Sequence, residues 1–285
     1  MDYLRAAKPR VVVLFLFTVL AAMLLAGRPP AWRIAAVLLL TGLTLGGASM
    51  LNNYVERGTD RRMERTCRRP TATGSLSPAR TLTAGLAAVV LGAAGLWAAA
   101  GPLAAALAAG GAAYYVVVYT LLLKPRTAMS AVPGGLAGVF PPLVGWAASG
   151  ASWSAKILFL CAVIYVWSPA HFWALAYARR EDYVLAGLPT PATRYGEKSA
   201  GLYIFAYVSA LTALAVLPAA AGAFGALYLT ASLIAGVAFL ALAVRLMVSH
   251  TRACAWTMYK FSGPYLGVMI LSMLLDRLLL PTLPG

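Results

Sequence analysis

Charged side chains are scarce in this sequence, and acidic ones are the scarcest. Aspartate and glutamate together number 8 among 285 residues, and all charged residues make up 11% of the chain. Hydrophobic residues make up 61%, and the mean hydropathy is +0.80. A soluble domain needs a polar surface that this composition does not provide, so the chain is expected to be an integral membrane protein.

Cysteine is also rare, and its spacing excludes two classes of small structural site. Cys67, Cys161 and Cys254 lie far apart and form no CxxC pair. An odd number of distant cysteines does not indicate a disulfide framework or a cysteine-based metal site. Low-complexity linkers are absent as well, so the simplest organisation is one domain over residues 1–285.

Long apolar runs take the place of the missing charge. A helix needs about 20 apolar residues to cross the hydrocarbon core of a membrane, and continuous runs of this kind exclude the shorter alternating strands of a membrane barrel. The sequence therefore predicts an all-α fold, a single bundle of nine transmembrane helices. The predicted helices cover residues 11–27, 33–52, 81–99, 102–123, 130–149, 156–178, 200–221, 224–247 and 261–280.

The excess of positive charge is explained by membrane topology. When the N-terminus and alternate loops are assigned to the cytoplasm, nearly all lysines and arginines fall on that side, as the positive-inside rule predicts. The exceptions are Arg28, Arg33, Lys156 and Arg277. The net charge of +15 thus indicates a lipid bilayer as the partner, with no nucleic acid expected. The expected location is a prokaryotic cell membrane with the charged loops in the cytoplasm.

Most of the acids fall in two loops on this cytoplasmic side, the first of them within LNNYVERGTDRRMERTCRRP, residues 51–70. Asn52, Glu56 and Asp60 recur every four residues and share one face of a continuing helix. Carboxylates at this spacing repel each other, whereas a divalent cation bound between them would reverse the effect. Amide and carboxylate oxygens suit Mg²⁺, which proteins commonly share with substrate phosphates. These three residues are therefore predicted metal ligands.

A row of arginines runs beside this acidic face. Arg57, Arg61 and Arg65 follow the same four-residue spacing, and Arg69 extends it. Guanidinium groups beside a metal ion suit a bound diphosphate, because both neutralise its negative charge. The alternative interpretation is a solvated helix at the membrane surface, whose acids only neutralise neighbouring arginines.

The second acidic loop favours the diphosphate interpretation. It lies in HFWALAYARREDYVLAGLP, residues 171–189, where Glu181 and Asp182 follow Arg180. Glu181 and Asp182 are further predicted metal ligands, so two clusters of acids and arginines at one membrane face could hold one diphosphate and its metal between them. The loops recur four helices apart, which is compatible with two related halves, residues 1–125 and 126–250, and a ninth helix. A third loop on the same side adds Lys124 and Arg126.

In this order, the segments resemble the UbiA-type intramembrane prenyltransferases. The resemblance includes the opening DYLRAAKPRVVVLFLFTVL, both acidic motifs, and the middle blocks YTLLLKPRT and GGLAGVFPPLVGWAA. It implies a nine-helix bundle with a cytoplasmic cavity, where Mg²⁺ binds farnesyl diphosphate. The members that the chain most resembles transfer farnesyl to a vinyl group of haem B, giving haem O. Such a product implies a further haem-modifying enzyme as a downstream partner.

The resemblance also assigns roles to particular residues. It places Asn52, Glu56, Asp60 and Asp182 on the metal-binding positions. Asp60, Asp182 and Lys124 are the residues expected to be central to catalysis, with Arg65 and Arg69 beside the diphosphate. The chain departs from the family pattern at Glu56, where aspartate is usual, and in the stretch TPATRYGEKSA from Thr190.

Other side chains are candidates for binding the prenyl group or the haem. Tyr115 and Tyr119, with Tyr114 and Trp167, could offer ring faces to an allylic cation. His171 lies near the end of a predicted span, where an imidazole is costly unless it has a use. It could orient or ligate haem, or simply hydrogen-bond to another helix.

Two alternatives to haem prenylation stay open at this point. One keeps the fold and the metal site but changes the acceptor to a quinone-precursor ring, a chlorophyll-type ring or a lipid alcohol. The other is a transporter or haem carrier that uses the charged loops as a vestibule. A transporter would be expected to carry ionisable residues deep within its spans, where this sequence has almost no carboxylates.

Overall fold

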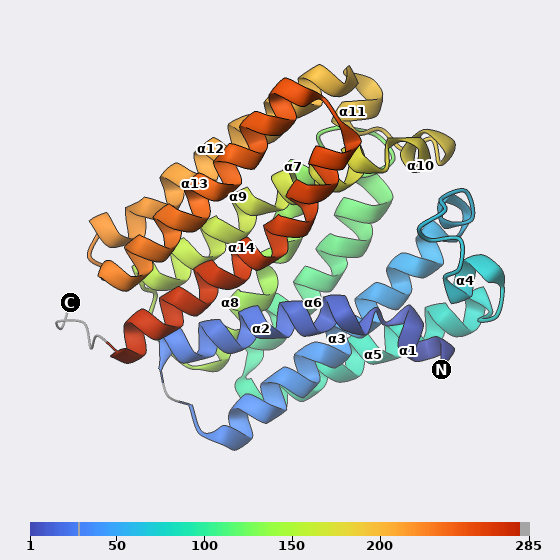
Figure 1. The fold of residues 1–285 in the computed structure, drawn as a ribbon. Coiled ribbons are helices and arrows are strands. Elements are labelled where there is room, and N and C mark those ends of the chain that lie inside the picture. Colours follow the sequence, from blue (N-terminus) through green and yellow to red (C-terminus); the bar gives the residue numbers. More distant parts are fainter. Residues whose placement is uncertain (28, 280–285) are drawn as a thin grey trace.

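The computed structural model describes residues 1–27 and 29–279. Arg28 lies outside this description, and so do residues 280–285. Residue 280 is the last residue of the predicted helix 261–280. Within the described residues, nine helical segments are long and apolar enough to cross a membrane. The all-α bundle predicted from the sequence is therefore confirmed (Figure 1).

The nine spans correspond to the predicted runs, with some differences at the ends. They are α2 (Pro9–Ala26), α3 (Ala31–Asp60), α5 (Pro78–Ala100), α6 (Pro102–Ala113) continued by η1 (Tyr114–Leu123), α7 (Ala131–Gly134) with η2 (Gly135–Gly138) and α8 (Phe140–Ala148), α9 (Ala155–Ala178), α12 (Gly196–Ala220), α13 (Ala226–Ser249) and α14 (Arg252–Leu279). Four short helices lie outside the spans: α1 (Asp2–Ala6) precedes the first span, and α4 (Pro70–Thr73), α10 (Arg180–Leu185) and α11 (Pro191–Arg194) lie in the connections.

The helices begin and end where local chemistry favours it. Proline occupies the first turn of α2, α5 and α6, where its missing N–H leaves no hydrogen bond unmade. Ser77 caps α5 by accepting a hydrogen bond from the backbone N–H of Arg80 at 3.3 Å. Gly101 separates α5 from α6 with φ of +92°, a conformation that glycine adopts without strain.

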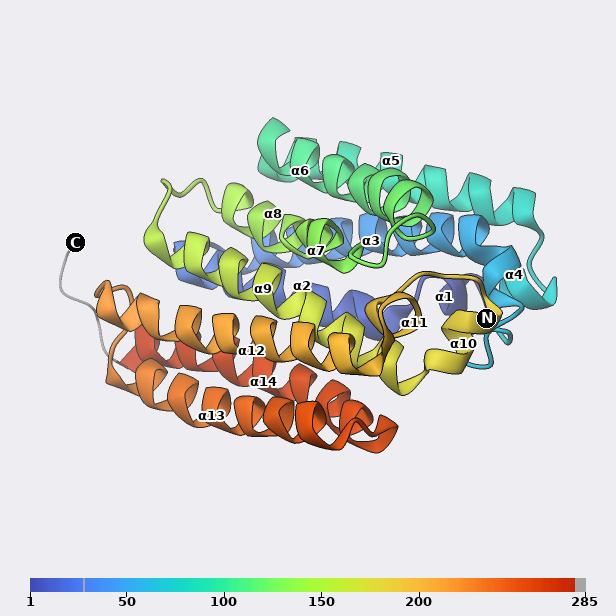
Figure 2. The same ribbon diagram turned by 90° about the horizontal axis from the view of Figure 1, so that it is seen from above.

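The spans are arranged in layers. Figure 2 shows α5 and α6 on one side, α12, α13 and α14 on the other, and α2, α3, α8 and α9 between them. Close approach of α3 to α5 depends on small residues, since a Cβ atom at Gly47 would lie 2.7 Å from the carbonyl oxygen of Gly85. Many leucines and valines are exposed on the outer helices, as expected for a surface that contacts lipid.

Two spans depart from regular α-helix near the charged end of the bundle. The span from α6 ends in a π-helical segment, η1, and the next span is broken between α7 and α8, where Pro133, Pro141 and Pro142 remove backbone donors. Gly134 lies in this break, and any Cβ atom there would collide with the Tyr119 ring. The irregular backbone thus makes room for an aromatic side chain.

The charged segments gather at one end of the bundle. Helix α3 continues as a regular helix to Asp60, well beyond the apolar run predicted to end at residue 52. The N-terminus, α1, α4, α10 and α11 lie toward this same end, whereas the last described residues of α14 lie at the other (Figure 1). Segments distant in the sequence can therefore contribute to one site here. The two four-helix halves stay a prediction.

Candidate active site

Three polar side chains form a row on the inner face of α3. Asn52, Glu56 and Asp60 are 2%, 9% and 2% exposed, respectively, although they lie at the polar end of the bundle. Burial of two carboxylates is costly unless cations or hydrogen-bond donors compensate for it. We call these three side chains the oxygen row.

Lysine and arginine side chains compensate the two carboxylates. Arg69 donates to both carboxylate oxygens of Asp60, at 2.9 and 2.8 Å, and lies 3.6 Å from Glu56. Lys124 forms an ion pair and hydrogen bond with the other oxygen of Glu56. Both cations are largely buried, so water screens these pairs less than it would at an open surface.

A third cation contacts the amide of the row. Lys8 donates from Nζ to Oδ1 of Asn52 at 2.5 Å, while Nδ2 of Asn52 donates to Oγ1 of Thr120 at 3.1 Å. Burial, together with repulsion from Arg69, lowers the pKa of Lys8 to about 7. The oxygen row thus has one cationic partner for each member.

Lys124 is held at the end of η1. Its backbone N–H donates to the carbonyl of Tyr119 at 2.9 Å, in the five-residue pattern of a π-helix. Burial alone would lower the pKa of Lys124, but the Glu56 carboxylate beside it raises that pKa above its ordinary value. Lys124 is therefore a permanent positive charge at this position.

The second acidic loop docks on the first. Asp182 is 6% exposed, and its Oδ1 accepts a hydrogen bond at 3.0 Å from the backbone N–H of Glu64. Its other oxygen, Oδ2, is buried without a hydrogen-bond partner. Met63 packs beside Tyr183 and Leu188 in a small apolar cluster between the loops. One Asp182 oxygen thus joins the loops, and the other is left without a hydrogen-bond partner.

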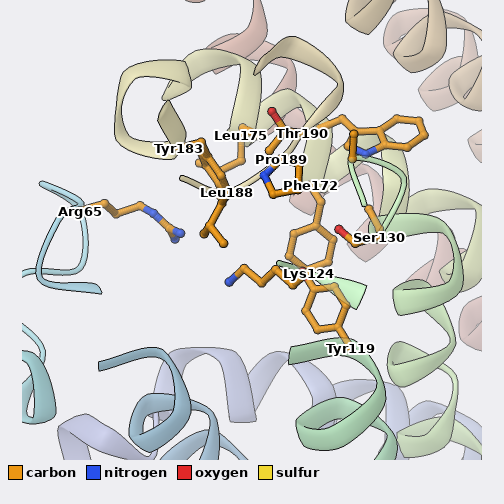
Figure 3. Close-up of a pocket in the computed structure, with 14 residues that line it drawn as sticks. Arg65, Tyr119, Lys124, Ser130, Phe172, Leu175, Tyr183, Leu188, Pro189 and Thr190 are labelled. Atoms are coloured by element: carbon orange, nitrogen blue, oxygen red, sulfur yellow. The ribbon is translucent and has the colours of Figure 1, made fainter. Parts of the chain in front are cut away.

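A cavity of about 540 Å³, counted with its open mouth, lies between these loops and the helices. Figure 3 shows Arg65 and Lys124 extending toward each other across it, with Tyr119 and Phe172 along the wall. The rings of Tyr119 and Phe172 are 6.2 Å apart, and Tyr115 stacks on Tyr119 at 6.0 Å. The cavity combines cations with aromatic faces, which is suitable for a diphosphate with an apolar tail.

His171 lies on α9, and its Nδ1 is 2.6 Å from Oγ of Ser262 on α14. When Ser262 donates its hydroxyl proton to the carbonyl of Tyr259, also 2.6 Å away, Nδ1 of His171 is the donor to that hydroxyl. Nδ1 then carries the proton and Nε2 keeps a lone pair. The ring stacks on Trp167, with centroids 4.4 Å apart.

The family follows from comparison with known sequences. The profile described as "UbiA prenyltransferase family" matches residues 15–264. This chain belongs to the UbiA prenyltransferase family.

Two curated relatives of this UbiA family member carry a specific name. "Protoheme IX farnesyltransferase 1" of Chromobacterium violaceum is 42% identical over 273 residues, which cover 95% of this chain and 91% of the relative. "Protoheme IX farnesyltransferase" of Teredinibacter turnerae is 39% identical over 285 residues, covering 98% and 91%. The family resemblance predicted from the motifs is confirmed.

Solved structures support the fold of this UbiA family member. A digeranylgeranylglyceryl phosphate synthase superposes with a TM-score of 0.81 at 15% identity, covering 98% of each chain. A UbiA homologue from Archaeoglobus fulgidus, bound to DMAPP and Mg²⁺, superposes with a TM-score of 0.70 at 16% identity, covering 96% of this chain and 99% of the homologue. At such low identity these neighbours show a shared fold.

The residues of the site are compatible with a divalent metal. Among residues 1–27 and 29–279, no three histidine, cysteine or carboxylate side chains are close enough to form a metal cage. Mg²⁺ does not require one, because it commonly takes one or two carboxylates and completes its shell with phosphates and water. The oxygen row offers two carboxylates and an amide, and Asp182 on the second acidic loop has one oxygen, Oδ2, without a hydrogen-bond partner.

The structure separates Glu181 from this group. Its side chain is 74% exposed and pairs with Arg252 at 2.7 Å. The hydrogen bond from Arg252, and then its charge, lower the pKa of Glu181. The neighbouring residue Asp182 faces the first acidic loop instead, so the two adjacent acids of this motif have different surroundings.

Four arginines of the predicted site donate to backbone carbonyls. Arg57 donates to Tyr54 at 2.6 Å, and its guanidinium lies 4.6 Å from the centre of that ring. The remaining bonds are from Arg61 to Ala72 at 2.8 Å, from Arg126 to Leu121 and Leu122 at 3.0 and 2.9 Å, and from Arg180 to Ala192 at 3.1 Å. Diphosphate binding by these arginines stays a prediction, whereas Arg65, Arg69 and Lys124 lie at the cavity or on the oxygen row.

Sequence reasoning did not identify Lys8, Thr120 or Ser262. Lys8 was explained by topology alone, and a serine or threonine within an apolar run gives no signal for a site. The sequence signal for Lys8 is the proline that follows it, because a residue before proline disfavours helical backbone and marks a helix boundary just before the first span.

Proposed function

We propose that this protein transfers the farnesyl group of farnesyl diphosphate to a vinyl group of haem B, giving haem O. The observation that carries the proposal is the buried oxygen row, with the free oxygen of Asp182, beside a cavity that Lys124 and Arg65 enter. The choice of haem as acceptor is supported by the names of the relatives that are about 40% identical.

The diphosphate group would bind at the polar end of the cavity. The oxygen row and Asp182 would hold Mg²⁺, and Lys124 and Arg65 would contact the phosphate oxygens directly. When bound, Mg²⁺ would supply positive charge next to the diphosphate, which must accept charge as it departs. Arg69 positions Asp60 through two hydrogen bonds, so that its carboxylate is oriented before the ligands arrive.

The first chemical event is heterolysis of the bond between farnesyl C1 and oxygen. The bonding electron pair goes to the diphosphate, where Lys124 and Arg65 stabilise the new charge without needing to reorganise. The allylic cation that remains faces the rings of Tyr119 and Phe172, whose π-electrons attract positive charge. Apolar walls also limit the access of water to this cation.

Bond formation then joins the farnesyl group to the porphyrin. The terminal carbon of the vinyl group supplies its π-electron pair to farnesyl C1, and positive charge moves to the carbon attached to the ring. A water oxygen adds to that carbon and loses a proton, which completes a hydroxyethylfarnesyl substituent. Orientation is the main requirement of this step, because no strong base is needed.

His171 is the residue that we propose to orient haem. Its Nδ1–H is held by Ser262, which leaves the lone pair of Nε2 for the iron or for another group of the porphyrin. Trp167 and Tyr259 flank the imidazole at centroid distances of 4.4 and 4.8 Å. Flat aromatic neighbours are compatible with a flat macrocycle.

We also propose that the protein lies in a cell membrane with both acidic loops in the cytoplasm. In a variant that lacks Cys67, Cys161 and Cys254, single cysteines at Gly58 and Ser152 test this orientation. Both positions are exposed, one near the end of α3 and one between α8 and α9. A membrane-impermeant thiol reagent applied to intact cells is expected to label Ser152→Cys only. Labelling of Gly58→Cys instead would reverse the orientation.

Lys124→Met is expected to raise the KM for farnesyl diphosphate by roughly 10-fold to 100-fold, the usual value of a charge-assisted hydrogen bond. The charge lost would contact the diphosphate in the bound state. Lys198→Met is the matched control, because Lys198 is an exposed lysine on α12 that is not among the residues lining the cavity. Equal effects of the two substitutions would remove Lys124 from the site.

The function itself is tested by mass spectrometry of the haems from cells that express this chain. The expected product is haem O, and purified protein should release pyrophosphate when farnesyl diphosphate, haem B and Mg²⁺ are all present. Prenylation of a quinone precursor or a lipid alcohol, with haem B unchanged, would contradict the proposed acceptor. Haem binding without pyrophosphate release would indicate a carrier.

A further inference from the structure

We infer that Lys8, at the junction of α1 and α2, is a further diphosphate-binding residue. This inference rests on the proposed function, since it assigns a new contact to the diphosphate of that reaction. The observation behind it is that Lys8 Nζ lies 2.5 Å from Oδ1 of Asn52, a member of the oxygen row that we propose to hold Mg²⁺.

The backbone at Lys8 has an unusual conformation, which sets the direction of the side chain. Lys8 has φ of 53° and ψ of 60°, a left-handed conformation that glycine adopts at lower cost than lysine. Pro9 follows and begins α2, so the chain turns sharply here. Strained backbone of this kind persists where the surrounding structure fixes it, and such positions are concentrated at functional sites.

A neighbouring contact already fixes α1 against α3. Nδ2 of Asn53 donates to the carbonyl of Ala6 at 2.9 Å, and Ala6 is fully buried. Asn53 thus anchors the end of α1, one residue away from the amide that Lys8 contacts. The Lys8 ammonium is not needed to anchor this helix, which leaves its charge available to a ligand.

Binding of a metal ion would change the partner of Lys8. A cation on Oδ1 of Asn52 repels the ammonium that occupies the same oxygen, so both cannot remain there. The backbone of Lys8 is anchored, but its four-carbon side chain can turn its three donors to a new acceptor nearby. The nearest incoming anion is the diphosphate that the metal binds.

The resulting arrangement surrounds the diphosphate with positive charge from separate parts of the chain. Lys124 approaches from the end of η1, Arg65 from the first acidic loop and Lys8 from the N-terminal segment. In the absence of ligands, Lys8 donates to the amide oxygen of Asn52, and Lys124 neutralises the carboxylate of Glu56. These lysines therefore exchange a protein oxygen for a phosphate oxygen when substrate binds.

The test measures binding of Mg²⁺ alone, and of inorganic pyrophosphate in the presence of Mg²⁺, by calorimetry on purified protein. Lys8→Met is expected to weaken pyrophosphate binding by about tenfold or more, as for loss of a charge-assisted contact. Binding of Mg²⁺ alone should stay equal or become tighter, because the competing ammonium has been removed. Lys8→Arg should restore much of the pyrophosphate affinity.

Arg5→Met is the matched control. The substitution removes one positive charge from the same N-terminal segment, but the Arg5 side chain is 73% exposed and pairs with Asp2 at 3.9 Å. Its substitution should leave both affinities unchanged. In the transfer assay, Lys8→Met should raise the KM for farnesyl diphosphate and not the KM for haem B.

The outcomes separate the inference from the proposed function. Wild-type pyrophosphate affinity in Lys8→Met would overturn the inference, as would a rise in the haem KM alone. Parallel loss of Mg²⁺ binding, pyrophosphate binding and thermal stability would make Lys8 structural. If the wild-type protein binds pyrophosphate with Lys8 dependence but makes no haem O, the inference stands and the proposed function fails.

Discussion

Asp182→Asn and Asp60→Asn are each expected to lower the rate of haem O formation by roughly 100-fold or more, a loss typical of removing electrostatic stabilisation from a departing group. Asparagine at position 182 can still accept the hydrogen bond from the Glu64 N–H, so the two loops should stay joined. It removes the negative charge of the carboxylate whose other oxygen, Oδ2, has no hydrogen-bond partner and is the proposed metal ligand. The measurement is single-turnover transfer from farnesyl diphosphate to haem B by purified protein.

Glu181→Gln is the matched control for Asp182→Asn. The two acids are neighbours in α10, but Glu181 is exposed and pairs with Arg252. Its neutralisation should change turnover by less than about threefold, since exposed ion pairs contribute little. If Asp182→Asn stays active while Glu181→Gln does not, the second motif uses the other acid. Activity in both aspartate variants would exclude the two-loop mechanism.

Glu56→Gln is the second substitution with a large expected effect, again roughly 100-fold in turnover. It removes a proposed metal ligand and leaves the charges of Lys124 and Arg69 without their shared carboxylate. Breaking a buried ion pair in this way also destabilises the fold, because the remaining charges stay desolvated. A lower Tm should therefore accompany the loss of activity.

Glu56→Asp tests whether the charge or the length of this side chain matters, because aspartate keeps the carboxylate on a shorter side chain. Aspartate is the usual family residue here and can still bind a metal, so most of the activity should remain. The carboxylate would be one methylene shorter, which weakens the contact with Lys124 and should raise the KM for farnesyl diphosphate. Equal loss of activity in Glu56→Asp and Glu56→Gln would mean that the length of the side chain matters more than its charge.

Much of this site was predictable because it depends on local spacing. Asn52, Glu56 and Asp60 share one face as soon as α3 continues past the membrane surface, since residues four apart on a helix lie on the same side. The spans were predictable for a similar reason, because the length of an apolar run is a local property. Lys124 could be placed near the site only through its position in a loop on the same side.

The sequence by itself determined the membrane bundle, its positively charged end and the row of oxygens on α3, because hydrophobic length and helical periodicity act within a segment. Only the tertiary structure decided which cation meets which oxygen, since these contacts join distant segments, as Lys8 does with Asn52. Only the tertiary structure shows that Asp182 contacts Glu64 whereas its neighbour Glu181 contacts Arg252. The physical reason is that adjacent residues on a short helix point in different directions, and the packing of α10 against its neighbours selects the one that faces the site.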